Sequence, residues 1–294
     1  MPQDQIHSQT TTPDKLLFAE FPPLVFFGTP DFAVPVLNAL QKNYQVAAIV
    51  TAPDKPVGRH RTLTPSPVAQ AAPTQIPLLK PKQLGNETIQ QLQNLKPGLF
   101  IVAAYGKIIP QELLDIPALG ALNIHPSLLP KYRGPSPVQN AILNGDNKTG
   151  VTIIKMDAQM DHGPIVSAKE YRLSQSDNYL TLGNKLFQTG AKDLLAILPD
   201  FINGKTAPQP QNHAETTYTK IITKENGFFD INNPPSTEKL DRMVRAFYPW
   251  PTAWTRWNNK VVKFLPGTLV QIEGKKPVPL KDFLNGHPDF SLKN

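Results

Sequence analysis

The stretch L-V-F-F-G-T-P-D-F-A-V-P-V-L-N-A-L-Q-K-N-Y-Q-V-A-A-I-V-T, residues 24–51, decides the fold class of this chain. It begins and ends with short apolar runs, 24–28 and 46–51, which are typical of buried strands. Residues 32–42 between them predict a helix. Parallel strands need a long crossover connection, so this order of elements predicts parallel pairing. We therefore expect an α/β fold with ligands at the carboxyl ends of its strands.

The alternation continues down the chain. We expect helices at residues 85–95 and 135–144, and a long one at 179–202 with Ser176 or Asp177 as its cap. Further strands are expected at residues 99–103, 121–125, 150–156 and 165–171. Residues 204–217, with two prolines and many polar side chains, predict a linker. Residues 1–22 are mostly polar, lack sustained periodicity and predict a tail.

Length and composition favour a soluble globular protein with one large and one smaller domain. The chain has 294 residues, of which 40% are hydrophobic and 18% charged. No apolar run approaches the roughly 18 residues of a membrane span, and the polar start lacks the apolar stretch of a secretory signal. We expect a cytoplasmic protein without membrane attachment. The absence of cysteine excludes disulfides and thiolate metal sites.

The formal net charge of +7 favours an acidic macromolecular partner, because clustered Lys and Arg release counterions from phosphates. A tRNA fits this description. The charge alone equally describes a generally basic soluble protein. A dinucleotide or metal site is not indicated. Residues 28–31 lack the Gly-x-Gly-x-x-Gly run of NAD sites, and the six histidines lack metal-ligand spacing.

The run N-I-H-P-S-L-L-P-K-Y-R-G, residues 123–134, carries the candidate chemistry. Asn123 and His125 are two apart in an expected strand and therefore point to the same side. An amide and an imidazole can both donate hydrogen bonds to a developing oxyanion, which suits acyl transfer. Lys131 and Arg133 follow in a rigid turn, where they either meet acidic groups of a ligand or face solvent.

This run resembles the signature of the 10-formyltetrahydrofolate-dependent formyltransferases. Five further stretches extend the resemblance over most of the chain, and the last of them, with the basic loop, resembles the tRNA-specific branch. They are V-F-F-G-T-P-D-F-A-V-P (25–35), the basic loop K-P-V-G-R-H-R-T-L-T-P-S-P-V (55–68), A-A-Y-G-K-I-I-P (103–110), G-V-T-I-I-K-M-D-A-Q-M-D-H-G-P-I (150–165) and R-A-F-Y-P-W-P-T-A-W (245–254).

The resemblance implies a Rossmann-like formyltransferase domain with a mostly parallel sheet over residues 23–203. A shortened, β-rich domain like an oligonucleotide-binding (OB) fold is implied over residues 218–294. The implied reaction moves a formyl group from 10-formyltetrahydrofolate, the cosubstrate, to the amino group of methionyl initiator tRNA. Asn123, His125 and Asp161 are the implied catalytic residues, with Asp161 favouring the imidazolium and accepting a proton. We expect a monomer.

The resemblance also implies the binding residues. The folate site is expected along Ser127, Leu128, Leu129 and Pro130, with backbone around Ala104, Tyr105 and Gly106. For tRNA, the candidates are Lys55, Arg59 and Arg61 in the basic loop, which suit phosphate or base-edge contacts. Replacing Arg59 is expected to weaken use of tRNA more than folate binding.

Two features depart from the family. The carboxy-terminal domain is short, so its tRNA contacts are in question, and Gln159 stands where the family commonly has glycine. A non-glycine at a positive φ would strain that turn. Two alternatives therefore stay open. One is a formyltransferase for an amino sugar or another small amine, and the other is a silent tRNA- or folate-binding protein.

Overall fold

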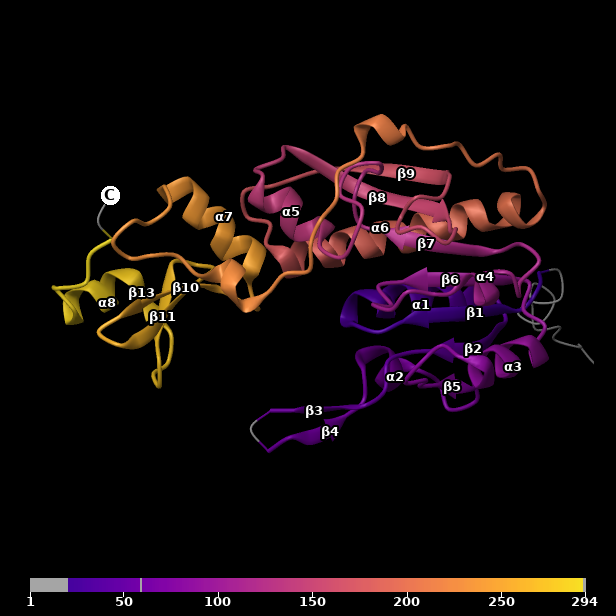
Figure 1. Cartoon of the computed structure of the whole chain (residues 1–294), viewed down its shortest axis with the longest axis horizontal. Coiled ribbons are helices and arrows are strands. Elements are labelled where there is room, and N and C mark those ends of the chain that lie inside the picture. The colour runs from indigo at the N-terminus through magenta and orange to yellow at the C-terminus, as the bar shows by residue number, and fades with distance from the viewer. Residues whose placement is uncertain (1–20, 59, 293–294) are drawn as a thin grey trace, which may run out of the picture.

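The computed structural model describes residues 21–58 and 60–292, so residues 1–20 of the expected tail, and Arg59, lie outside the described residues. The molecule is elongated, with a large α/β part at one end and a smaller part at the other (Figure 1).

The large part is built on a seven-stranded sheet, which confirms the expected α/β fold with a mostly parallel sheet. The strand order is β5-β2-β1-β6-β7-β8-β9. The first five strands in this order pair in parallel, while β8 pairs antiparallel with both of its neighbours, β7 and β9. The strands are β1 (Leu24–Gly28), β2 (Val46–Val50), β5 (Leu78–Leu79), β6 (Leu99–Ala103), β7 (Ala121–His125), β8 (Lys148–Lys155) and β9 (Ile165–Arg172).

Helices cover both faces of this sheet because successive strand residues point to opposite sides. Leu24 and Phe26 pack into one core with α1 (Val34–Asn43) and α6 (Tyr179–Ile202), while Val25 and Phe27 pack into another with α3 (Asn86–Asn94) and α4 (Gln111–Leu114). The short η3 (Asp31–Ala33) leads into α1, and α2 (Pro67–Ala71) and α5 (Pro137–Leu143) complete this part.

The cap expected for α6 at Ser176 or Asp177 is wrong by one or two residues. Asn178 is the cap, and its side chain accepts hydrogen bonds from the backbone of Leu180 and Thr181. Asp177 instead accepts from the Ser174 backbone and pairs with Lys185 at 2.7 Å. Several short polar residues stood in a row, and spacing alone did not select among them.

The smaller part contains α7 (Thr237–Phe247) and a four-stranded antiparallel sheet, in agreement with the expected β-rich domain. Its strands are β10 (Ala253–Trp257), β11 (Lys260–Leu265), β12 (Leu269–Ile272) and β13 (Val278–Pro279), followed by α8 (Leu280–Gly286).

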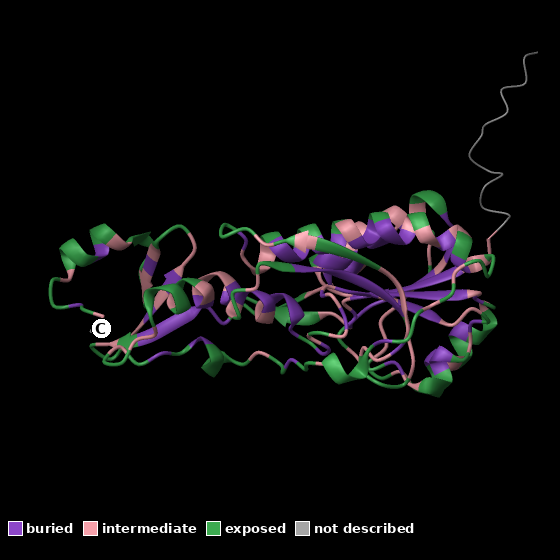
Figure 2. Ribbon diagram, turned by 90° about the horizontal axis from the view of Figure 1, so that it is seen from above, coloured by how far each residue is buried: buried purple, intermediate pink, exposed green. Residues whose placement is uncertain are grey.

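The two parts share an apolar core where α5 and α7 meet. Val138 and Ile142 of α5 and Leu186 of α6 pack with Met243 and Phe247 of α7, and all five are buried. Figure 2 shows buried residues continuing from the large part into the smaller one. The smaller part is therefore anchored by apolar packing as well as by the chain connection.

The connection between the parts, residues 203–223, is bound along the large part and contains η4 (His213–Glu215). The backbone of Gln209 pairs with Ile165 of β9, and further on Tyr218 forms a bridge with Arg133. The segment predicted as a linker is therefore extended but attached. It reaches η5 (Lys224–Gly227), the first helical element of the smaller part.

Candidate active site

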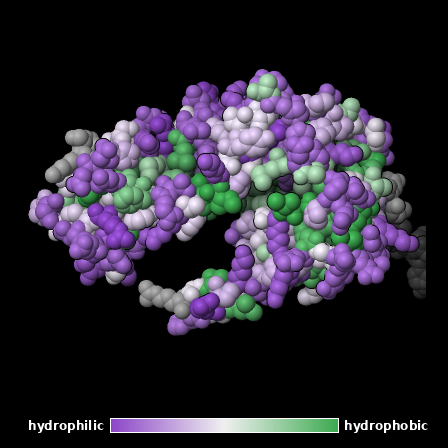
Figure 3. Space-filling model, in the orientation of Figure 1, coloured by the Kyte–Doolittle hydropathy of each residue, from purple (hydrophilic) through white to green (hydrophobic). Residues whose placement is uncertain are grey.

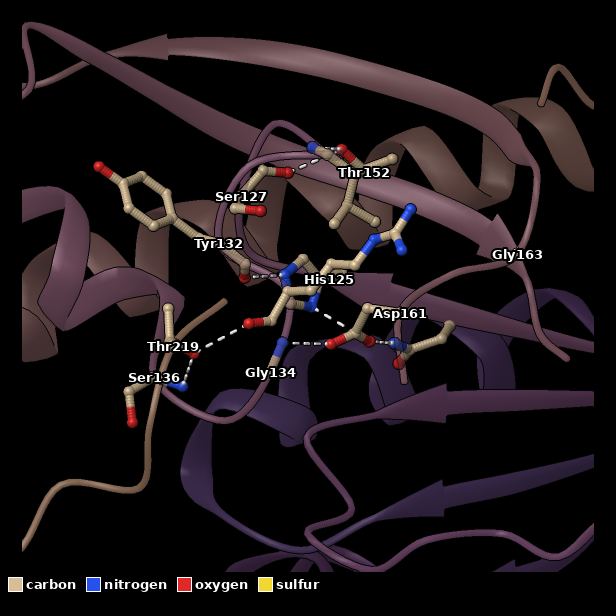
Figure 4. A network of polar contacts seen from close by, with 12 residues as sticks. His125, Ser127, Tyr132, Gly134, Ser136, Thr152, Asp161, Gly163 and Thr219 are labelled. Atoms are coloured by element: carbon tan, nitrogen blue, oxygen red, sulfur yellow. Dashed lines mark hydrogen bonds and ion pairs between the residues drawn. The ribbon is translucent and has the colours of Figure 1, made fainter. Parts of the chain in front are cut away.

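The carboxyl end of β7 presents Asn123 and His125 to the same carboxylate. Asn123 Nδ2 donates to Asp161 Oδ1 at 3.3 Å, and His125 Nδ1 lies 3.5 Å from the same oxygen. The other oxygen, Asp161 Oδ2, accepts from the Gly134 backbone at 2.8 Å. Figure 4 shows His125, Gly134 and Asp161 converging in this way. The structure thus joins residues 38 positions apart in the sequence.

Both nitrogens of the His125 ring face oxygen acceptors. Nδ1 faces Asp161, and Nε2 lies 3.0 Å from the backbone oxygen of Tyr132. A ring protonated on both nitrogens satisfies this arrangement fully, because only the imidazolium donates from both. The side chain is 5% exposed, so its orientation is fixed by these contacts and by packing. Both ring nitrogens are therefore directed at protein oxygens beside the Asn123 amide.

Asp161 lies in the turn between β8 and β9 and has a φ of +50°. The sequence suggested a strained positive φ at Gln159, but Gln159 is not among the described residues with a positive φ. The positive φ of this turn is at Asp161 instead. Gly163 ends the turn, and a Cβ there would collide with the Lys155 carbonyl oxygen. His162 Nδ1 and Asp157 Oδ2 close the turn at 2.6 Å. The aspartate is held in an unfavourable backbone conformation by the contacts around it.

The loop after β7 is supported from within. Ser127 is fully buried, and its hydroxyl donates to the Lys131 carbonyl at 2.6 Å. Thr152 donates to the Ser127 carbonyl and accepts from the Leu129 backbone, and Leu129 is also buried. The side chains of Ser127 and Leu129 therefore shape the loop from inside, whereas Leu128 and Pro130 are partly exposed.

The second expected folate segment follows β6, the neighbour of β7. Ala104 and Gly106 adopt positive φ values of 47° and 78°, which turn the backbone sharply at this edge. Tyr105 is buried between them, and its ring packs edge-on against Phe27 at 5.4 Å. Burial raises the pKa of Tyr105 to about 12. The Tyr105 side chain therefore belongs to the core, which leaves the backbone of this segment for the expected folate contact.

Arg133 fits neither interpretation considered for it. It is 2% exposed, so it neither faces solvent nor awaits an acidic ligand on an open surface. Its guanidinium donates to Gln211 Oε1, from Nε at 3.2 Å and Nη2 at 2.6 Å, and Nη2 lies 2.8 Å from His213 Nδ1. Arginine is rarely buried, and its partners come from the connecting segment, so local sequence gave no sign of this contact. Lys131 is exposed.

The basic loop forms a two-stranded hairpin, β3 (Lys55–Val57) and β4 (Thr62–Thr64), that projects from the large part (Figure 1). Lys55 and Arg61 are exposed on it, and Arg59 lies outside the described residues. The hairpin stands opposite the smaller part across an opening in the surface (Figure 3). Neither Lys55 nor Arg61 is brought to the Asp161 cluster by a hydrogen bond or ion pair within the described part of the chain.

Among residues 21–58 and 60–292, no three His, Cys, Asp or Glu side chains are grouped as a metal site. No helix in those same ranges combines the length and apolarity needed to span a membrane.

Comparison with known proteins identifies the family. Residues 23–198 match the formyl transferase family, and residues 221–270 match the formyl transferase C-terminal domain. The methionyl-tRNA formyltransferase of Roseiflexus sp. (strain RS-1) is 40% identical over 90% of this chain and 92% of its own length. The chain belongs to the methionyl-tRNA formyltransferase family. The resemblance seen in the sequence motifs is thereby confirmed.

Solved structures agree with the fold. The methionyl-tRNA formyltransferase from Clostridium thermocellum superposes with a TM-score of 0.59 at 17% identity, covering 87% of this chain and 96% of that one. A sugar N-formyltransferase from Shewanella sp. superposes with a TM-score of 0.64 at 18% identity, covering 86% and 98%. At these identities the likeness concerns the fold alone.

Proposed function

We propose that this chain transfers a formyl group from 10-formyltetrahydrofolate to the amino group of methionyl initiator tRNA, for translation initiation in the cytoplasm. The observation that carries the proposal is the meeting of Asn123, His125 and Asp161 at one sheet edge. It occurs in a chain that is 40% identical to a methionyl-tRNA formyltransferase over nine-tenths of its length.

Asn123 and His125 stabilise the oxyanion in this proposal. The amine attacks the formyl carbon, and the carbonyl oxygen becomes negative in the tetrahedral intermediate. Asn123 Nδ2 uses one hydrogen on Asp161, and its second hydrogen is available for the oxyanion. His125, as an imidazolium, adds a positive charge at the same edge, with its two ring nitrogens directed at Asp161 and the Tyr132 carbonyl. No nucleophilic side chain is required, and the buried Ser127 is not placed for that role.

Asp161 accepts the proton released by the attacking amine in this proposal. Its side chain is 13% exposed, enough to contact water or substrate, and it holds its second oxygen on Gly134. The carboxylate accepts the ammonium proton directly or through water. The carbon–nitrogen bond to the folate then breaks, and the departing folate nitrogen takes up the proton that the carboxylate accepted, directly or through water. The oxyanion returns to a carbonyl as the amide forms.

The folate is proposed to lie against the exposed parts of the two loops, which are Leu128 and Pro130 after β7 and the backbone of Ala104 and Gly106 after β6. These segments follow neighbouring strands and meet at the sheet edge that carries the catalytic residues. Ser127, Leu129 and Tyr105 support them from inside.

The acceptor is proposed to contact the hairpin through Lys55, Arg59 and Arg61, and the smaller part on the other side of the opening in Figure 3. Exposed cations on a projecting hairpin suit phosphates. In this division of labour, residues 23–203 form the catalytic domain, 204–217 the linker and 218–294 the tRNA-side domain, whose first residues, 218–223, still run along the large part as the end of the connecting segment. The protein acts as a monomer.

The test is transfer of labelled formyl from 10-formyltetrahydrofolate to methionyl initiator tRNA. Uncharged initiator tRNA, which lacks the amine, is the negative substrate. Asn123→Ala and His125→Ala are expected to lower the rate about a hundredfold or more. Asn203→Ala is the matched control, because this amide only caps the end of α6 on the surface.

Two outcomes would replace the proposal. Transfer to an amino sugar with no transfer to tRNA would make the chain a small-amine formyltransferase. Folate binding without transfer to either acceptor would make it a silent binding protein.

A further inference from the structure

Gln211, in the connecting segment, makes four hydrogen bonds from a buried position. Its side-chain oxygen accepts from Arg133 Nε and Nη2 at 3.2 and 2.6 Å. Its nitrogen donates to the backbone oxygens of Asp161 and Gly163 at 2.9 and 2.7 Å. The residue is 5% exposed. Two accepted and two donated bonds use the full capacity of a primary amide.

The orientation of the Gln211 amide follows from chemistry. A guanidinium only donates, so the amide oxygen must face Arg133. Backbone carbonyls only accept, so the amide nitrogen must face Asp161 and Gly163. Arg133 therefore fixes which end of Gln211 points at the turn. Because Arg133 is itself buried, water does not compete for its hydrogen bonds to Gln211, and the Gln211 amide keeps this orientation.

The turn needs such a contact because of the Asp161 backbone. A non-glycine residue with φ near +50° is disfavoured, and it persists when neighbouring contacts hold it. Gln211 holds the carbonyl of Asp161 itself and the carbonyl two residues later. The direction of the Asp161 side chain depends on that backbone, and its carboxylate meets Asn123, His125 and Gly134.

We propose that Gln211 is a positioning residue that sets the Asp161 carboxylate against Asn123 and His125, with Arg133 orienting its amide. The kinetic part of this inference rests on the function proposed above. Through this contact, a residue of the segment that leads to the smaller part controls the geometry of a catalytic group 50 positions earlier in the chain.

Two variants separate a positioning role of Gln211 from a role in which its side chain only fills space. Gln211→Glu keeps an acceptor for Arg133 but loses both donors and turns an oxygen toward the two carbonyls. Gln211→Leu has a similar size and removes all four bonds. Gln209→Leu is the matched control, because the Gln209 side chain donates only to the nearby Ala207 carbonyl on the surface.

The first readout is amide hydrogen exchange, which needs no substrate. The Gly134 N–H bonds to the Asp161 carboxylate, whereas the N–H groups of Arg133 and Ser136 bond to Thr217 and Thr219 of the connecting segment. In Gln211→Glu we expect the Gly134 amide to exchange about tenfold faster, while the amides of Arg133 and Ser136 keep their wild-type rates. If all three amides exchange faster by the same factor, or if the Gly134 amide does not exchange faster, then Gln211 only attaches the connecting segment to the large part and does not position Asp161.

The second readout is steady-state formyl transfer. We expect kcat of Gln211→Glu to fall by about tenfold or more, since a shift of about 1 Å in a catalytic group can cost about a hundredfold. The KM for 10-formyltetrahydrofolate should stay near wild type, and Gln209→Leu should match wild type in both constants. A wild-type kcat in folded Gln211→Glu overturns the inference. If the wild-type protein transfers nothing to tRNA, the proposed function fails, and the exchange rates still decide the role of Gln211.

Discussion

Tyr132 contributes to the site through its backbone and to stability through its side chain. Its carbonyl faces His125 Nε2 at 3.0 Å, while its hydroxyl donates to Asp146 at 2.7 Å and accepts from Asn144 at 2.8 Å. Burial, followed by the contacts with Asp146, raises the pKa of Tyr132 to about 12. The neutral hydroxyl is thus favoured in the folded state.

This shift predicts an alkaline loss of stability. A tyrosine in the unfolded chain titrates near pH 10, so the contribution of Tyr132 is complete below about pH 10 and is lost as the pH rises toward about 12. We expect Tyr132→Phe to lose about 1 kcal/mol of stability at pH 7, and to decline less steeply than wild type between pH 10 and 11. Urea unfolding at each pH measures both effects.

Tyr105 supplies the contrast for that measurement. Its hydroxyl is buried and has no hydrogen-bond partner among the described residues. Tyr105→Phe should therefore leave stability at pH 7 unchanged or slightly raised. Equal losses at pH 7 in the two variants would contradict the assigned roles of the hydroxyls.

At the scale of residues, sequence spacing predicted that Asn123 and His125 share a side, because strand geometry is local. Asp161 came from family resemblance, since spacing does not say which turn returns to which strand. Neither source indicated the contact of Arg133 with Gln211. That contact joins positions 78 apart, through an arginine that would ordinarily be exposed.

Among the elements, the β3–β4 hairpin is suited to contact a partner and not to carry out the chemistry. Its three-residue strands pair only with each other, and Lys55 and Arg61 are exposed on it. Contacts from such cations to phosphates strengthen binding in a salt-dependent way and do not depend on base sequence.

We expect Lys55→Ala and Arg61→Ala to raise the KM for methionyl-tRNA several-fold and leave the KM for 10-formyltetrahydrofolate unchanged. The salt dependence of the tRNA KM should become shallower by about one unit of log–log slope for each lost phosphate contact. Lys42→Ala, at the exposed end of α1, is the control for lost charge. An unchanged slope in both hairpin variants would remove these residues from the acceptor surface.

The main strands and helices of the large part were predictable because their apolar periodicity is strong and their flanks carry turn residues. The bounds of β1, β6, β7 and α6 agree with the expectation. The two-residue β5 and the short hairpin strands were not predicted, because they are too short to show a period. Whether these short segments form strands depends on the segments that lie beside them in the fold.

At the scale of the whole molecule, the shared core predicts that both parts unfold together. All three tryptophans, Trp250, Trp254 and Trp257, lie in the smaller part, whereas most helix lies in the large one. We expect the thermal transitions followed by tryptophan fluorescence and by far-ultraviolet circular dichroism to coincide. Met243→Ala should lower both by several degrees, since it removes a buried side chain worth about 2–5 kcal/mol.

Met160→Ala is the matched control, because Met160 is 52% exposed. Separate transitions in the wild type would show that the α5–α7 contact is too weak to couple the parts. The sequence predicted two domains but not this coupling, since an apolar helix face does not identify the surface that covers it.

The α5–α7 contact also affects the entropy of association. A ligand that touches the large and small parts at once meets two surfaces whose separation is already fixed, so the second contact costs little additional rotational or translational freedom. The two-stranded hairpin has no such support, because isolated hairpins are only marginally stable in water. For a ligand that contacts the hairpin as proposed above, the ordering entropy of binding is therefore concentrated in the hairpin, and stiffening this one element would tighten binding without any new contact.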